Sequence, residues 1–254
     1  MNYKFKTKCT KLLSDLFTPV EVYLKIRDTY PNSFLLESSD YKSKENSFSY
    51  LCFNPIAEFK VDQNQLLVSY PNSKMESRSI DSLNIAEELN SFVGQFETEE
   101  LHKAFATNGL FGYTSYDAIP LFQPIEFQSS SIEIPLIQYH LFKNLIVFNH
   151  FNNELYIVEN LLAGEESETE MIKNLLANRA IHQFKFEKDG VETSNVSDEE
   201  YLENVKAGIQ HCHRGDVFQV VLSRKFKQGF KGDEFNVYRA LRSVNPSPYL
   251  FYFD

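Results

Sequence analysis

The stretch from Ser197 to Asp254 constrains the fold of this chain most strongly, because it marks where two helices begin and end. Ser197 is followed three residues later by Glu200, the capping-box spacing in which each side chain bonds the other residue's free backbone N–H. Gly215 stands where a left-handed residue would end this helix. Apolar residues recur between these signals at helical spacing, at Tyr201, Leu202, Val205, Ile209 and Cys212. The sequence therefore predicts a helix between Ser197 and Gly215.

The residues after Gly215 carry alternating strand and helix signals. Val217 to Leu222 is an apolar run with one polar residue, which predicts a strand covered on both faces. A second helix is predicted from Glu234 to Val244, because the prolines of the segment 245–248 cannot continue a helix. Tyr249 to Phe253 is predicted as a final strand.

Five segments of the sequence resemble, in the same order, motifs of the chorismate-utilising enzymes. They are FLLESSD (34–40), NGLFGYTSYD (108–117), VFNHFNNELYIV (147–158), GDVFQVVLSRKF (215–226) and NPSPYLFYF (245–253). Within these enzymes the chain is most similar to the anthranilate synthase component I family, the larger subunit of the enzyme that opens tryptophan biosynthesis. Each match alone is modest, but the five together extend over most of the chain.

The pattern of the remaining chain predicts an α+β fold with large, mostly antiparallel sheets, because strands outnumber helices and hairpins predominate. Strands are expected at 33–38, 48–53, 56–61, 65–70, 134–142, 144–149, 154–159 and 181–187, with a turn at Asn54–Pro55. Single helices are expected at 18–30, 83–93 and 168–180. The resemblance implies a sandwich of two sheets that enclose helices, truncated before most of the catalytic domain.

The resemblance also implies a division into domains. Residues 1–188 would form an amino-terminal regulatory domain. Residues 189–254 would hold a linker and the incomplete start of the chorismate-binding catalytic domain, with the polar segment 188–196 as the linker.

Charge and cysteine content limit the classes of partner. The chain has 254 residues, a net charge of −10 and a pI near 5.2, which disfavours nucleic acid and anionic membranes as partners. Its three cysteines share no metal or redox spacing, so we expect a reduced, cytoplasmic location. No segment approaches the ~18 apolar residues of a membrane span, and the lysines near Met1 precede no signal-peptide core.

We expect neither catalytic residues nor a metal site within this chain. Converting chorismate into an aminated aromatic with loss of pyruvate needs a general acid and base, and carboxylates that hold Mg²⁺. The resemblance implies that these groups lie in motifs beyond Asp254, so the chain alone is expected to be inactive. His211 and His213 are two positions apart on a helix and point apart, which favours a helix C-terminus over a metal site.

Two further motifs favour structural interpretations. Gly109 and Gly112 lack the lysine of a phosphate-binding loop, so closely packed backbone in a strand explains them better. His150 precedes the Asn152–Asn153 turn and is interpreted as the end of a hairpin rather than as a base.

The resemblance implies an L-tryptophan feedback site on two distant segments. Its residues are Glu37, Ser38, Pro248, Tyr249 and Leu250. The two polar side chains would accept the ligand's ammonium, and the other three residues would form a slot for the indole. Burying an indole of ~150–250 Å² at about 25 cal/mol/Å² contributes roughly 4–6 kcal/mol, so the ring would supply most of the affinity.

The residues alone allow simpler interpretations. Glu37 fits a strand-end carboxylate in an ion pair, and Pro246 and Pro248 fit a helix stop. Leu250 replaces the methionine of many relatives, a swap of similar volume. No basic residue occurs in the segment 47–50, where the family often has one, which predicts fewer partners for Glu37 or for the ligand carboxylate.

Three functions stay open at this point. In anthranilate synthase component I, chorismate would be the substrate, and a glutamine amidotransferase subunit, component II, would supply ammonia. Aminodeoxychorismate synthase component I of the folate pathway shares the fold and much of the segment 215–224. A free-standing amino-acid-binding module would have no catalytic half. The sequence LLES and the tyrosine of NPSPY favour the first of these.

Overall fold

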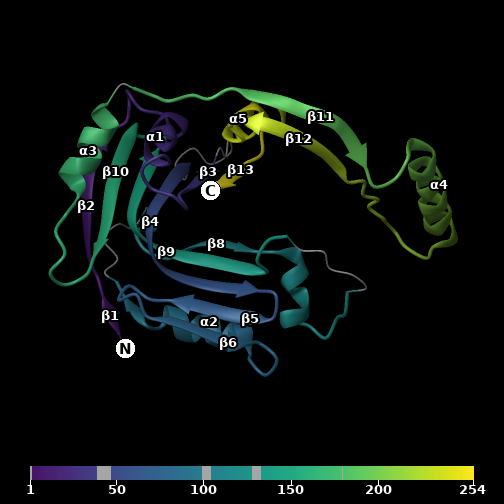
Figure 1. Ribbon diagram of the computed structural model, residues 1–254, viewed down its shortest axis with the longest axis horizontal. Coiled ribbons are helices and arrows are strands. Elements are labelled where there is room, and N and C mark those ends of the chain that lie inside the picture. Colours follow the sequence, from purple (N-terminus) through teal and green to yellow (C-terminus); the bar gives the residue numbers. More distant parts are fainter. Residues whose placement is uncertain (1, 39–46, 99–103, 128–132, 179) are drawn as a thin grey trace. The chain divides into compact units, whose positions relative to one another are not determined.

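The computed structural model describes residues 2–38, 47–98, 104–127, 133–178 and 180–254. The chain forms two compact units, one of residues 1–182 and 242–254, and the other of residues 183–241 (Figure 1). The division into a regulatory and a catalytic domain near residue 188 stays a prediction.

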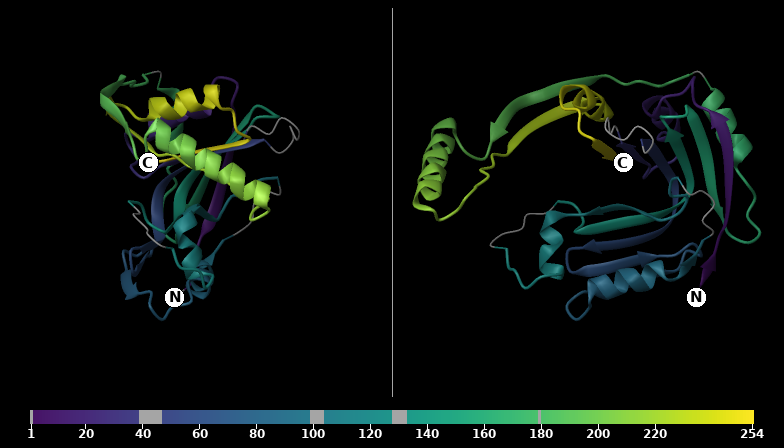
Figure 2. Two further views of the ribbon diagram at one scale, coloured as in Figure 1. Left: turned by 90° about the vertical axis from the view of Figure 1, so that its right-hand side faces the viewer. Right: turned by 180° about the vertical axis from the view of Figure 1, so that it is seen from behind.

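A nine-stranded sheet forms most of the larger unit (Figures 1 and 2). Its strands are β2 (Lys6–Leu13), β3 (Phe34–Ser38), β4 (Phe48–Asp62), β5 (Gln65–Ser69), β6 (Met75–Ser79), β8 (Leu110–Thr114), β9 (Ile137–Asn149), β10 (Glu154–Leu161) and β13 (Tyr249–Phe253). Six strands follow the order β13-β3-β4-β9-β10-β2, while β5 pairs with β4 and β6, and β8 pairs with β9. Every one of these pairs is antiparallel, so the predicted fold class is confirmed.

The two longest strands, β4 and β9, differ from their predictions. Asn54–Pro55 is not a turn, because β4 continues through it and its register to β9 shifts between Pro55 and Ala57. Asn54 adopts a φ of 60°, and a bulge of this kind tolerates the missing N–H of a proline inside a strand. β9 likewise joins the two strands predicted at 134–142 and 144–149 into one.

Three α-helices, one 3-10 helix (Tyr116–Leu121) and a short strand pair complete the described part of the larger unit. α1 (Pro19–Ile26) starts at Thr18, whose hydroxyl accepts the Glu21 N–H, and it contacts β3, β4 and α3 (Thr169–Ala177). α2 (Ile85–Val93) packs Phe92 against Phe59 of β4, with ring centroids 5.6 Å apart. β1 (Tyr3–Lys4) pairs in parallel with β7 (Phe96–Glu97). α1 and α2 thus bury apolar residues against the sheet, as their spacing predicts.

Gly112 explains how β8 lies against β9. A Cβ at this position would be 1.9 Å from the Gln138 carbonyl oxygen and 2.7 Å from the Tyr139 Cα. Only glycine fits such close backbone packing. The interpretation of this glycine as a strand residue is therefore confirmed.

The smaller unit contains one long helix and a two-stranded ribbon. α4 (Asp198–Arg214) has the predicted capping box, in which the Glu200 N–H donates to the Ser197 hydroxyl at 3.1 Å and the Ser197 N–H to the Glu200 carboxylate at 2.8 Å. Gly215 ends α4 with a left-handed φ of 79°. The ribbon joins β11 (Phe186–Ser194) to β12 (Phe226–Gly232), and α5 (Phe235–Val244) follows.

One prediction for this region is wrong. Residues 217–222 form no strand, and Phe218 is 99% exposed. An apolar run becomes a strand only where neighbouring backbone takes up its N–H and C=O groups. Most of the segment 188–196 lies within β11, which pairs with β12, and its assignment as the linker between two domains stays a prediction.

Candidate functional site

Two segments that are distant in the sequence meet at the edge of the large sheet. β13 lies beside β3 (Figure 1). In this antiparallel pair Tyr249 lies opposite Ser38 and Leu250 lies opposite Glu37. Pro248 immediately precedes β13. The structure therefore brings together the two halves of the predicted ligand site.

The same pairing distributes the side chains over two faces of the sheet. Opposite residues of an antiparallel pair point to the same face, and successive residues to alternate faces. Glu37 and Leu250 share the face on which α1 packs, since the ring of Tyr23 lies 5.6 Å from that of Tyr252. Ser38 and Tyr249 share the other face. A ligand that contacts both sets must lie across the end of the strand pair.

The face with Ser38 offers aromatic surface. Tyr249 is 70% exposed, and Phe251, next on the same face, is also exposed. The ring of Phe253 stacks on Phe251 at 5.1 Å and on Tyr113 at 5.8 Å. A row of accessible rings of this kind suits contact with a flat aromatic ligand.

Glu37 is a buried carboxylate, and one arginine contacts both of its oxygens. Its side chain is 8% exposed, and Arg242 in the last turn of α5 approaches with Nη2 2.9 Å from Oε1 and Nε 2.8 Å from Oε2. This is the ion pair that the residues alone suggest for Glu37. The cation beside Glu37 comes from α5 and not from the segment 47–50, and the expectation of fewer partners than in the family stays a prediction. Sequence reasoning missed Arg242, because no pattern near Arg242 or near Glu37 indicates that two residues so distant in the sequence form an ion pair.

A second polar pair lies beside Glu37. Ser49, the register partner of Glu37 on β4, is 2.7 Å from the Nε2 of His150, which follows β9. Burial, and then the positive charge of Arg242, lower the pKa of His150. The Ser49 side chain is buried, which argues against a nucleophilic serine and for a structural bond at a hairpin end.

The described residues offer no metal centre. His211 and His213 lie in the last turn of α4, and the Nδ1 of His211 is 2.8 Å from Asp216. Across the described ranges, no three or more His, Cys, Asp or Glu side chains are placed to hold a metal ion. These residues therefore do not fit the Mg²⁺ that the family resemblance implies, and we derive no metal-dependent step from them.

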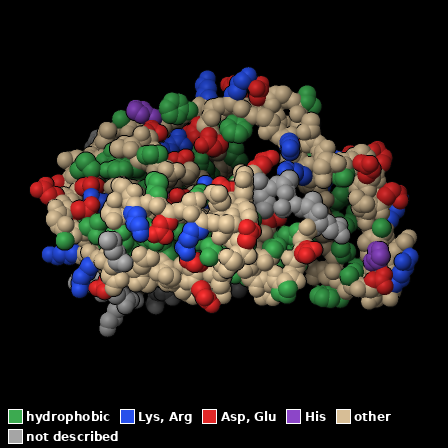
Figure 3. Space-filling view, turned by 60° about the horizontal axis from the view of Figure 1, so that its bottom comes forward, with side chains coloured by type: hydrophobic (Ala, Val, Ile, Leu, Met, Phe, Trp, Pro, Cys, Tyr) green, Lys and Arg blue, Asp and Glu red, His purple; other side chains and the backbone are tan. Residues whose placement is uncertain are grey.

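Other surface and covalent features are ordinary. Cys9, Cys52 and Cys212 are free thiols, and burial raises the pKa of Cys9 and Cys52. On the face shown in Figure 3, acidic and basic side chains are intermixed. None of the helices in the described part of the chain has the length and apolar character to cross a membrane.

The fold and the sequence together define the class of this protein. The sequence pattern of the chorismate binding enzymes matches residues 12–254, so the chain belongs to this family. Anthranilate synthase component 1 of Lactococcus lactis is 30% identical over 258 residues, covering 97% of this chain and 54% of that protein. The same protein from Aquifex aeolicus is 28% identical over 272 residues, covering 100% of this chain and 54% of the relative.

The comparison of structures agrees with the comparison of sequences. The crystal structure of anthranilate synthase component I from Streptococcus pneumoniae aligns with a TM-score of 0.52 and 20% identity, covering 93% of this chain and 53% of that one. This likeness establishes the fold. The chain spans about half the length of the relatives that it matches.

Proposed function

We propose that this chain is a part of anthranilate synthase component I, which converts chorismate and ammonia into anthranilate and pyruvate in tryptophan biosynthesis. Membership of the chorismate binding family and the names of its relatives support this assignment. The name component 1 of those relatives supports a second subunit, a glutamine amidotransferase that provides ammonia. The free thiols are consistent with a location in the reducing cytoplasm.

The chain's own contribution is to bind L-tryptophan at the β3–β13 junction. The observation that carries this proposal is the register in which Glu37 and Ser38 lie opposite Leu250 and Tyr249. Glu37 and Ser38 accept hydrogen bonds from the ligand's ammonium, while Pro248, Tyr249 and Leu250 contact the indole. The ring contributes roughly 4–6 kcal/mol at about 25 cal/mol/Å², and the polar contacts select an amino acid over free indole.

Feedback inhibition then follows from linkage. The ligand must bind the inhibited arrangement more tightly, and moving a population from 1:99 to 99:1 requires about 5.5 kcal/mol of preference. The catalytic general acid, general base and Mg²⁺ site are assigned outside these residues, so the chain alone is inactive. Formation of anthranilate, or of its para isomer, by this chain would contradict that part of the proposal.

Calorimetric titration with L-tryptophan tests the binding site. The chain is expected to bind L-tryptophan at one site, and Ser38→Phe is expected to weaken binding at least about tenfold, because the larger ring occupies the ligand's place and removes a hydroxyl acceptor. Ser77→Phe, at an exposed serine of β6 in the same sheet, is the matched control and should bind normally. Equal affinity in wild type and Ser38→Phe removes Ser38 from the site, and no binding to wild type rejects the tryptophan assignment.

A further inference from the structure

Glu37 and Arg242 present opposite charges side by side at the proposed ligand site. We propose that they form a receptor for the charged end of a free α-amino acid, in which Arg242 binds the α-carboxylate and Glu37 binds the α-ammonium. This inference rests on the proposed L-tryptophan site and identifies the residue that recognises the ligand's negative charge.

The geometry of the pair supports an exchange of partners. Arg242 contacts both oxygens of Glu37, through Nη2 at 2.9 Å and Nε at 2.8 Å. A guanidinium has five N–H donors in a planar fork, so these two nitrogens do not exhaust its capacity. The side chain of Arg242 is 38% exposed whereas that of Glu37 is 8% exposed. Solvent, and therefore a ligand, reaches the arginine side of the pair.

The location of the pair suits the rest of the ligand. Glu37 lies opposite Leu250, one of the residues proposed to contact the indole. Arg242 lies in the last turn of α5, a few residues before Pro248. An amino acid whose ring rests on the start of β13 would therefore hold its charged groups next to both members of the pair.

A zwitterion is the ligand that such a pair accepts at the lowest cost. A buried charge that loses its partner is strongly destabilised. An α-amino acid brings one charge of each sign, so each side chain keeps a partner when the ligand binds. A ligand with an ammonium alone, or a carboxylate alone, satisfies only one of them, and this asymmetry gives specificity.

Among the residues that the structure describes around Glu37, Arg242 supplies the positive charge. His150 lies close by, and burial followed by the charge of Arg242 lowers its pKa, so that it is neutral at pH 7. Its ring bonds to Ser49 at 2.7 Å. Recognition of the carboxylate therefore depends on the guanidinium fork, whose planar geometry matches two carboxylate oxygens.

Titrating three ligands into single variants of the chain tests this assignment. The ligands are L-tryptophan, tryptamine, which has no carboxylate, and indole-3-propionate, which has no ammonium. Arg242→Gln is expected to weaken L-tryptophan and indole-3-propionate about 10- to 100-fold. Tryptamine should bind at least as tightly as to wild type, because its ammonium no longer competes with Arg242 for Glu37. Glu37→Gln is expected to weaken L-tryptophan and tryptamine and to spare indole-3-propionate. Arg242→Lys should restore only part of the affinity, because an ammonium lacks the fork.

Two further variants separate recognition from folding. Glu37→Gln combined with Arg242→Gln leaves no unpaired charge, so it should melt near the wild-type temperature and still lose L-tryptophan. Arg239→Gln removes another arginine of α5, one that bonds Asn236 at 3.0 Å, and should bind all three ligands normally.

The outcomes test the role of Arg242 separately from the proposed L-tryptophan site. If wild type binds L-tryptophan and a folded Arg242→Gln binds it equally well, the role of Arg242 is wrong and the site remains. Equal weakening of L-tryptophan and tryptamine in Arg242→Gln also rejects the role, because the carboxylate then makes no difference. If wild type binds no L-tryptophan, the site itself is rejected and the receptor with it.

Discussion

The larger and the smaller unit are ordered by different kinds of interaction. In the larger unit, strands distant in the sequence pair side by side, and their side chains fill cores around Phe59 and Phe142. In the smaller unit, α4 is capped by its own capping box at the N-terminus and by Gly215 at the C-terminus. Two strands of this unit form a ribbon. Large apolar side chains such as Phe218 and Val191 remain exposed there. Burial therefore stabilises one unit, while local backbone chemistry shapes the elements of the other.

Replacing one phenylalanine in each unit should show this difference most strongly. Phe59→Ala removes a fully buried ring that contacts Phe92, and we expect it to lower the free energy of unfolding by about 3–5 kcal/mol. Phe218→Ala removes a ring that is 99% exposed, so the change should stay within about 0.5 kcal/mol. Urea unfolding followed by circular dichroism measures both values. Losses of similar size would contradict the contrast between the two units.

The helix ends and hairpins could be predicted because their causes are local. Ser197, Glu200 and Gly215 lie within the helix that they cap. The turn at 152–153 needs a left-handed residue, and Asn153 adopts a φ of 54°. Such features depend on a few consecutive residues, so the sequence alone contains the information.

The errors arose where the outcome depends on a distant partner. β4 passes through Pro55 because β9 pairs with it on both sides of the bulge. Val217 to Leu222 fails to form a strand although its composition favours one. For these segments the backbone of another part of the chain decides the structure.

The candidate site shows the same limit. The resemblance suggested its two halves, but only the register reveals that Leu250 lies opposite Glu37 and Tyr249 opposite Ser38. The position of Glu37 at the end of a strand suggested that it forms an ion pair, but the sequence did not indicate which residue supplies the cation. Arg242 is identified by its contacts at 2.8 and 2.9 Å and by no pattern near Glu37.

The helix caps allow a more sensitive comparison, because each unit contains a helix whose first turn is capped by a hydroxyl. Ser197→Ala removes the capping hydroxyl of α4 and should cost about 1 kcal/mol. Thr18→Ala removes the equivalent bond in α1, which also packs against β3 and β4. Hydrogen exchange should therefore quicken over the first turn of α4 in Ser197→Ala, but change less in α1 of Thr18→Ala. Equal quickening in both helices would mean that packing does not secure α1.

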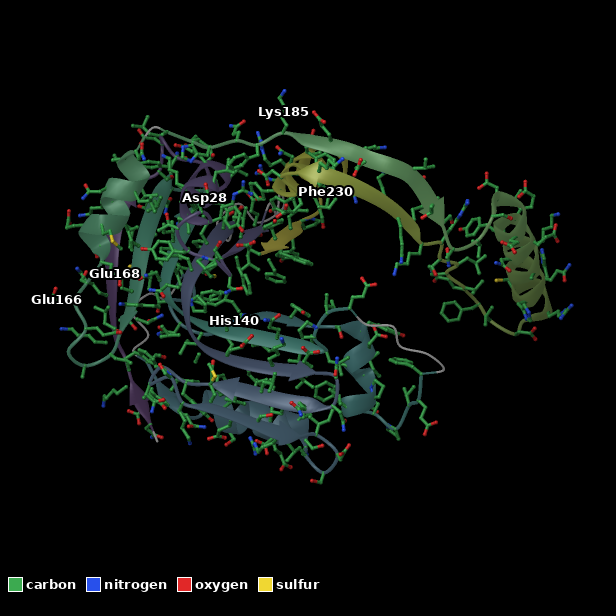
Figure 4. All side chains as sticks on the ribbon, viewed as in Figure 1. Asp28, His140, Glu166, Glu168, Lys185 and Phe230 are labelled. Atoms are coloured by element: carbon green, nitrogen blue, oxygen red, sulfur yellow. The ribbon has the colours of Figure 1, made fainter. Side chains whose placement is uncertain are left out.

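The smallest expected effect concerns His140, a buried residue of β9 in the larger unit (Figure 4). Burial lowers its pKa, the Glu58 carboxylate 3.7 Å away partly raises it, and Lys60 lowers it further. The folded state therefore binds this proton less readily than the unfolded state, whose histidine pKa is about 6.5. Stability should therefore fall as the pH drops below that value, because protons then bind preferentially to the unfolded state.

His140→Phe tests this pH dependence while keeping an aromatic ring beside Phe34 and Phe142. Among the described residues the Nδ1 of His140 has no hydrogen-bond partner, so the substitution leaves no new unpaired group at that atom. The variant should match or exceed wild-type stability at pH 7.5 and lose less stability than wild type between pH 7 and pH 5.5 in urea unfolding. Above pH 7, where the histidine is neutral in the folded and unfolded states, the free energies of unfolding of the two proteins should depend on pH in the same way. If the free energy of unfolding falls equally in both proteins between pH 7 and pH 5.5, groups other than His140 cause the pH dependence. Burial in the larger unit would then stabilise the fold without making its stability depend on protonation of His140.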